Sequence, residues 1–249
     1  MNAVTSEPFF VRRRTWSSHE VLHHNDFSRV QLSDLQREEL KPAFWSFLCS
    51  EYDSVNLFTE IQKRKHQFSP DFLAFAQAWR TDEENHAAGF AAIYERFFDV
   101  PSEQIARDLP ARPVDFERVE EFLADEFQLS LVLAYDEIVT THAYHRDIPM
   151  YASFGPRAYV NWIRFVKRDE ALHFNNLLRL IRRNHRHRLG EVRGVLERVL
   201  AVDVHGDYGG TFVLDHGGPG FNLSHDELSS ICANTILKKL TNEARKKSP

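Results

Sequence analysis

Two short stretches decide the fold of this chain: WRTDEENHAAGF at residues 79–90 and VKRDEALHF at residues 166–174. Each stretch contains a glutamate followed three residues later by a histidine, which gives Glu83, His86, Glu170 and His173. Side chains three residues apart lie on one face of an α-helix, so each pair can reach the same metal ion. The pattern therefore predicts two long helices that bring two carboxylates and two imidazoles to one place.

Two further carboxylates, Glu51 and Glu137, lie in two other stretches that are predicted to be helical. In helical bundles that hold two iron or manganese ions, a Glu from each of two helices joins a Glu-x-x-His element from each of the other two. Glu51 and Glu83 are almost equally far from the turn between their helices, whereas Glu60 is too near that turn. We therefore favour Glu51 over Glu60 as the third carboxylate. Four carboxylates balance two divalent ions, and oxygen ligands combined with imidazole suit iron or manganese.

Start and stop signals predict an all-α fold. The expected helices cover residues 34–41, 42–65, 70–98, 115–146, 156–184, 189–201 and 225–245. Pro42 marks a kink or a new start, residues 99–114 with three prolines form a connection, and Pro149 bounds a loop. We expect one domain with three parts: an N-terminal arm (1–30), a helical bundle (31–201), and a glycine-rich loop followed by a C-terminal helix (202–249).

Composition narrows the function classes. The chain of 249 residues has a formal charge of -5 and a pI near 6.2, which does not favour nucleic-acid binding. Its two cysteines cannot form a disulfide framework. The N-terminus lacks the apolar core of a signal peptide, and no apolar stretch is long enough to span a bilayer. We therefore expect a cytoplasmic protein.

Three segments resemble those of the soluble acyl-carrier-protein desaturases, which belong to the ferritin-like di-iron superfamily. They are AWRTDEENHAAG (78–89), YDEIVTTH (135–142) and VKRDEALHF (166–174). The resemblance runs from about residue 42 to residue 185. It implies a ferritin-like four-helix bundle with two iron ions, or manganese as the alternative. The six ligands implied by position are Glu51, Glu83, His86, Glu137, Glu170 and His173.

The same resemblance implies roles for three neighbouring residues. Asp169 would orient the ligand His86, and such partners fix the tautomer of a ligating histidine. Trp79 would lie buried one turn below Glu83. Thr140 would place its hydroxyl near the face where dioxygen binds.

The implied reaction is a dioxygen-dependent oxidation, of which desaturation of an acyl chain is our first expectation. The acyl group could arrive on an acidic carrier protein, which would dock on a basic cluster after the fourth helix, formed by Arg179, Arg182, Arg183 and Arg186. Cations at a helix C-terminus are also favoured simply by the helix dipole. A ferredoxin or reductase is implied as electron donor, because the sequence has no flavin or nicotinamide motif. The resemblance also implies a homodimer.

Other functions remain open. A di-iron monooxygenase or N-oxygenase for a free small molecule is the main alternative. The arylamine-oxidising subtype often has an extra histidine one turn before the last Glu-x-x-His, and Val166 stands there. Iron oxidation for storage fits poorly with the arm and the glycine-rich tail. A bundle without metal that serves as a binding module is the last alternative.

Overall fold

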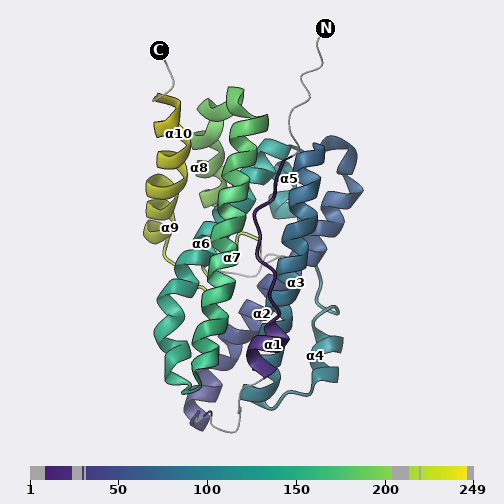
Figure 1. Cartoon of the computed structure of the whole chain (residues 1–249), viewed down its shortest axis with the longest axis vertical. Coiled ribbons are helices and arrows are strands. Elements are labelled where there is room, and N and C mark those ends of the chain that lie inside the picture. The colour runs from purple at the N-terminus through teal and green to yellow at the C-terminus, as the bar shows by residue number, and fades with distance from the viewer. Residues whose placement is uncertain (1–8, 24–29, 31, 204–212, 219, 246–249) are drawn as a thin grey trace.

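The computed structural model describes residues 9–23, 30, 32–203, 213–218 and 220–245, and all regular structure in them is helical. Four long helices form the bundle (Figure 1): α2 (Asp34–Lys63), α3 (Pro70–Phe98), α6 (Glu126–Ser153) and α7 (Arg157–Asn184). α2 packs along α3, α6 packs along α7, and α3 also lies against α7. The expected all-α class is confirmed for this part of the chain.

Shorter helical elements surround the bundle. They are α1 (Ser18–His23), α4 (Ser102–Asp108), α5 (Glu120–Leu123), α8 (Val192–Asp203), α9 (His225–Ile231), a π-helical turn (Cys232–Leu237), α10 (Lys238–Arg245) and three 3₁₀ turns (Lys65–Gln67, Glu117–Val119 and Arg186–Glu191). Two of them correct the sequence prediction, because α1 lies inside the predicted arm and α4 inside the predicted connection. Parts of the arm (1–8 and 24–29) and of the glycine-rich segment (204–212 and 219) lie outside the described residues. None of the helices described here is long and apolar enough to cross a membrane.

Side-chain caps determine where the long helices begin. The Ser69 hydroxyl accepts a hydrogen bond from the backbone N–H of Phe72 at 3.2 Å, and α3 starts at Pro70 as predicted. The third long helix was predicted to begin at Asp115, which is wrong. Asp115 Oδ1 accepts a hydrogen bond from the backbone N–H of Glu117, the first residue of a short 3₁₀ turn. The cap of α6 is Asp125, which accepts from the backbone N–H of Gln128.

Two prolines lie inside long helices, where the sequence predicted interruptions. Pro42 is within α2 and Pro149 is within α6. A proline leaves the carbonyl four residues earlier without its helical partner. Those carbonyls belong to Glu38 and His145, which are both exposed, so water can hydrate them. The predicted new start at Pro42 and the predicted loop at Pro149 are therefore wrong.

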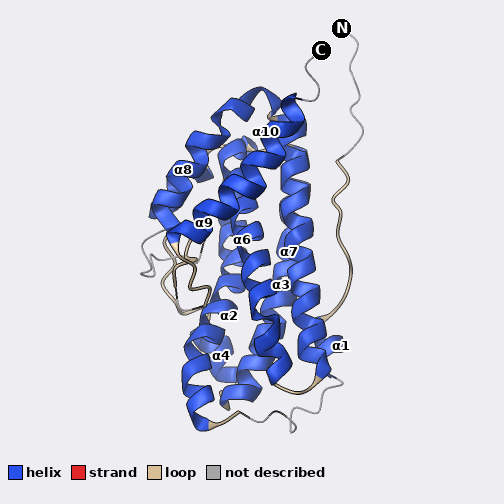
Figure 2. Ribbon diagram, turned by 90° about the vertical axis from the view of Figure 1, so that its left-hand side faces the viewer, coloured by secondary structure: helices blue, strands red, loops and turns tan. Residues whose placement is uncertain are grey.

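Residues 9–17 of the arm run along α3 and α7 on one side of the bundle (Figure 1 and Figure 2). The backbone N–H of Arg12 donates to Asn176 Oδ1 at 3.0 Å, and Asn176 Nδ2 donates back to the Arg12 carbonyl at 2.7 Å. Because Asn176 is fully buried on α7, this pair holds the arm in one register against the helix.

Residues 213–218 and 220–224 cover the opposite side, where α2 and α6 approach each other less closely than α3 and α7 do. The Phe221 ring lies between the two helices, with centroids 5.5 Å from Phe47 of α2 and 6.1 Å from Tyr144 of α6. Arg146 donates to the Phe221 carbonyl at 2.7 Å. The glycine-rich segment thus completes the core on this side.

Gly89 permits the close approach of α3 and α7, and we expect Gly89→Ala to destabilise the fold. A Cβ atom at residue 89 would lie 2.4 Å from Nε1 of the buried Trp162 on α7. Alanine normally stabilises a helix by about 1 kcal/mol relative to glycine, but overpacking here should reverse the sign and destabilise by about 2 kcal/mol. Urea denaturation measures the difference. Gly194→Ala on α8 is the control, because its Cβ would meet nothing within 4 Å. Equal free energies of unfolding for Gly89→Ala and the wild type would contradict the prediction.

Candidate metal centre

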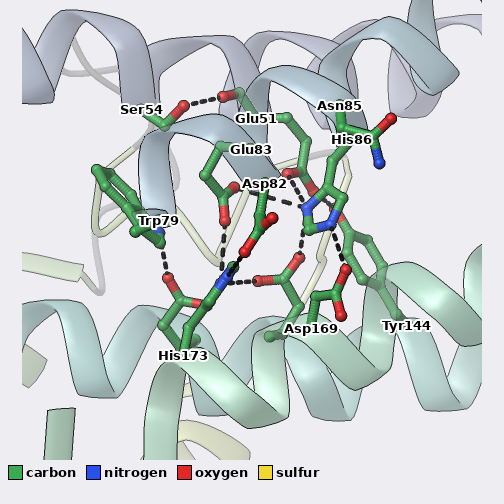
Figure 3. Close-up of polar contacts among 12 residues, drawn as sticks. Glu51, Ser54, Trp79, Asp82, Glu83, Asn85, His86, Tyr144, Asp169 and His173 are labelled. Atoms are coloured by element: carbon green, nitrogen blue, oxygen red, sulfur yellow. Dashed lines mark hydrogen bonds and ion pairs between the residues drawn. The ribbon is translucent and has the colours of Figure 1, made fainter. Parts of the chain in front are cut away.

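Six buried side chains from the four long helices meet at the centre of the bundle (Figure 3). They are the six residues that the sequence analysis named: Glu51 of α2, Glu83 and His86 of α3, Glu137 of α6, and Glu170 and His173 of α7. They form two groups of four, in each of which the potential ligand atoms lie within 4.8 Å of one another. Glu83 and Glu170 belong to both groups.

The first group surrounds Nδ1 of His86. The carboxylate oxygens of Glu170 and Glu51 lie 3.2 and 3.3 Å from this nitrogen, and an oxygen of Glu83 lies 3.8 Å from it. One nitrogen and three oxygens thus point toward a common position. This is a ligand set that iron or manganese accepts while positions stay open for another molecule.

The second group repeats this arrangement around Nδ1 of His173. Oxygens of Glu137, Glu83 and Glu170 lie 3.1, 3.2 and 3.5 Å from it. Glu83 directs Oε2 toward His86 and Oε1 toward His173, and Glu170 directs Oε1 toward His86 and Oε2 toward His173. Each of these two carboxylates can therefore bridge a pair of ions.

The charges of the cluster favour cations. Burial, followed by the neighbouring Glu170, raises the pKa of Glu51 well above its ordinary value. Burial also raises the pKa of Glu137, and Glu170 adds to this effect although His173 opposes it. Burial would lower the pKa of His86, but Glu170 and Asp169 reverse the direction and raise it. Without metal, Glu51, Glu137 and His86 therefore keep their protons to higher pH than the free side chains do.

The donor atoms fit two divalent ions. Oε1 of Glu83 and Oε1 of Glu170 are buried and accept no hydrogen bond, although buried carboxylate oxygens normally do. A cation at each position would supply the missing partners: one beside His173 for Glu83 Oε1 and one beside His86 for Glu170 Oε1. Four carboxylates and two imidazoles around two ions of charge +2 also leave the buried site neutral.

A second layer of carboxylates holds the outer nitrogens of the two imidazoles. Asp169 Oδ2 lies 3.5 Å from His86 Nε2, and Asp82 Oδ2 lies 3.2 Å from His173 Nε2. Each aspartate thus reaches the histidine of the other helix and leaves Nδ1 of that ring for the metal. The role of Asp82 was missed from the sequence. The signal was present, because an aspartate directly precedes both Glu83 and Glu170.

The arm adds a third layer that the sequence analysis also missed. The Trp16 indole N–H donates to Asp169, and Arg13 Nη2 lies 2.6 Å from Asp82 Oδ1. The Trp16 ring also stacks near His86, with centroids 6.0 Å apart. The arm therefore supports both histidines through their aspartates.

We expect Trp16→Phe to weaken metal binding about 10-fold, in line with the loss of other hydrogen bonds that orient metal ligands. Phenylalanine keeps an aromatic ring in the arm but removes the N–H that fixes Asp169. Competition against a chelating dye measures the affinity. Trp45→Phe is the matched control, because Trp45 packs on Tyr94 away from the centre. The same metal affinity in the wild type, Trp16→Phe and Trp45→Phe would contradict the role assigned to Trp16.

Two more side chains bind the metal-facing carboxylates directly. Trp79 donates its indole N–H to Glu137 Oε1 at 2.6 Å, and the Tyr144 hydroxyl donates to Glu51 Oε1. Trp79 is buried as expected for a neighbour of Glu83, but its hydrogen bond goes to Glu137.

A cavity of about 50 Å³ lies beside the four carboxylates, on the side of α2 and α6. Thr140 lines it. The other lining residues are Ser50, Glu51, Ser54, Leu57, Trp79, Glu83, Leu133, Asp136, Glu137, Glu170, Val213 and His216. A water molecule takes about 30 Å³ in the liquid, so the cavity has room for a small molecule such as dioxygen.

Some charged candidates are engaged elsewhere. Glu60 binds Lys63 and Arg64 at the surface, at 2.6 Å from Lys63. Asp53 is buried but pairs with Arg112 at 2.7 Å. Neither carboxylate belongs to the cluster.

The basic cluster predicted to dock a carrier protein is largely used for packing within the chain. Arg179 donates to the Phe10 carbonyl of the arm at 3.0 Å, and Arg183 pairs with Asp71 of α3 at 2.9 Å. Arg182 donates to the Lys239 carbonyl of α10 at 3.0 Å, and Arg186 is exposed.

Fold and site together define an all-helical protein with a buried carboxylate–histidine cluster that can hold metal. Comparison of the chain with known protein families, with curated proteins and with solved structures found no match.

Proposed function

We propose that this chain is a ferritin-like di-iron oxidoreductase that uses dioxygen to oxidise an organic substrate. The observation that carries the proposal is the sharing of Glu83 and Glu170 between the two groups of ligand atoms. Carboxylates that bridge two ions, next to a cavity large enough for dioxygen, are what such a centre needs. A metal site with a purely structural role would not need a cavity beside its carboxylates.

The bound iron pair would supply electrons to dioxygen, and the chain would supply geometry and a water-poor site. Asp82 and Asp169 hold the imidazoles, and Trp79 and Tyr144 hold the outer carboxylates. For desaturation, the overall reaction converts CH2–CH2, dioxygen, two electrons and two protons into CH=CH and two water molecules. The two electrons come from an external donor such as a ferredoxin or a reductase.

Two substrate classes compete. Desaturation of an acyl chain follows from the resemblance, and Leu57, Leu133 and Val213 supply an apolar part of the cavity wall. The alternative is oxygenation of a small polar molecule such as an amine. The cavity volume of about 50 Å³ and the presence of Asp136 and His216 in its wall favour this alternative.

The test is oxygen uptake by iron-loaded, anaerobically reduced protein. We expect about two irons per chain, rapid uptake of dioxygen, and neither of these in Glu170→Ala. Mass spectrometry of acyl-carrier-protein, acyl-thioester and amine substrates then separates desaturation, which removes two hydrogens, from oxygenation, which adds oxygen. Failure to bind iron during iron-replete expression would overturn the proposal and leave a helical binding module.

A further inference from the structure

His216 brings a third imidazole to the centre from the glycine-rich segment, far from the ligands in sequence. Its side chain is 3 % exposed and lines the cavity whose other wall contains Glu51, Glu83, Glu137 and Glu170. A molecule in this cavity therefore lies between the metal-facing carboxylates and His216. His216 belongs to neither group of potential ligands.

Asp203 at the end of α8 fixes the orientation of this ring. His216 Nδ1 lies 2.8 Å from Asp203 Oδ2, and the His216 backbone N–H donates to Asp203 Oδ1, also at 2.8 Å. The Tyr135 hydroxyl donates to the same carboxylate. Nδ1 is thereby the protonated nitrogen that faces Asp203. Nε2 lies 3.8 Å from Asp136 Oδ1, too far for a direct hydrogen bond.

The surroundings of His216 favour its charged form. The polar groups around it are Tyr135 and Asp136 of α6, Asp203 of α8, Asp215 beside it, and Cys232 of the π-helical turn behind Asp203. Burial alone would lower the pKa of His216, but Asp203, Asp136 and Asp215 outweigh burial and raise it. Burial likewise opposes the charge of Asp203, yet His216 lowers the pKa of that carboxyl. The two residues thus form a buried histidine–aspartate pair in which each residue favours the charged form of the other.

The proposed oxidation needs such a group, because two protons must reach dioxygen from solvent in each turnover. The six ligand side chains cannot supply these protons while they bind metal, since metal binding requires their deprotonated forms. Ser54 in the cavity wall already donates its hydroxyl proton to the Glu51 carbonyl at 2.6 Å. A proton donor with a pKa near or above neutral is what general acid catalysis requires.

We propose that His216 is the catalytic acid of this centre and that Asp203 is its positioning residue, an inference that rests on the proposed oxidase function. His216 gives its Nε2 proton to an oxygen atom of the molecule in the cavity. The Nε2–H bond breaks, an O–H bond forms, and the neutral imidazole stays bound to Asp203 through Nδ1–H. No atom changes its oxidation state in this step, and solvent returns the proton.

The test compares His216→Gln and Asp203→Asn with the wild type, and His225→Gln at an exposed position is the matched control. Both test variants should keep the wild-type iron content. The rate of oxygen uptake should fall about 100-fold in His216→Gln. The wild-type rate should decrease at high pH, where the acid loses its proton, and this decrease should be absent from His216→Gln. Wild-type rate and pH profile in iron-loaded His216→Gln would overturn the proposal.

A second measurement does not depend on activity or on the variants being folded. Nitrogen NMR of the histidines in zinc-loaded wild-type protein should show His216 losing its Nε2 proton at a pH above the ordinary midpoint of 6.5. A His216 that is already neutral at pH 6 would also overturn the proposal. If the wild type bound iron but took up no dioxygen, the oxidase function itself would fail, whatever the NMR showed for His216.

Discussion

Glu170→Gln is expected to abolish metal binding at both positions of the centre, whereas Glu51→Gln and Glu137→Gln should each abolish it at one. Glu170 places one oxygen near each imidazole, while Glu51 lies beside His86 alone and Glu137 beside His173 alone. Metal analysis should therefore give about two ions per chain in the wild type, about one in either single-site variant and about none in Glu170→Gln.

Glutamine is the informative replacement because it keeps the shape of the side chain. Burial raises the pKa values of Glu51 and Glu137, so both carboxyls keep their protons to higher pH than a free glutamic acid, and a neutral amide resembles the protonated carboxyl. The amide oxygen of a glutamine at residue 137 can still accept the hydrogen bond from Trp79, and that of a glutamine at residue 51 can still accept the hydrogen bond from Tyr144. We therefore expect these variants to fold and to lose metal without losing the bundle.

Inductively coupled plasma mass spectrometry of protein purified after iron-replete expression measures the stoichiometry, and circular dichroism checks the helices. Glu84→Gln is the control, since Glu84 follows Glu83 directly but pairs with Arg80 on the outside of α3. Equal losses in Glu51→Gln, Glu137→Gln and Glu170→Gln would argue against two positions that share bridging carboxylates. Unchanged metal content in Glu170→Gln would place the metal elsewhere.

The bundle could be predicted where local signals are strong. α3 begins and ends at the predicted residues, Pro70 and Phe98. Its start is marked locally, by the Ser69 hydroxyl that caps the N–H of Phe72 and by Pro70 at the first helical position. The start of α6 could not be predicted in the same way. Asp115 and Asp125 are equally good caps locally, and packing of the intervening residues 117–123 as separate short turns decides between them.

The ligand cluster followed from the helical period, since residues that repeat on one face of a helix must face the same neighbour. The residues around it did not follow, because they come from segments without any period. Arg13, Trp16 and His216 reach the centre only through the path that the arm and the glycine-rich segment take over the bundle. That path depends on distant contacts such as Asn176 with the arm.

Metal affinity is expected to fall by at least about 100-fold per ion when the pH is lowered from 8 to 6, because each ion must displace at least one proton. The direction of this pH dependence follows from the raised pKa values. In the metal-free protein the carboxylates raise the pKa of His173 as they do that of His86, despite burial, and Glu51 and Glu137 also keep their protons to higher pH. Metal binds the deprotonated forms, so a higher pH favours it until these groups have titrated.

Competition with a chelator of known pH dependence, with zinc as the probe ion, measures the slope, and calorimetry in buffers of different ionisation enthalpy counts the protons released. Glu51→Gln provides the matched comparison, because it should leave only the position beside His173 able to bind an ion. Its remaining ion, beside His173, should keep the slope set by His173 and Glu137. An affinity that does not change with pH, with no proton release, would mean that the cluster is already deprotonated without metal. The buried carboxylates would then lack compensating charge in the metal-free chain, which their burial makes physically unfavourable.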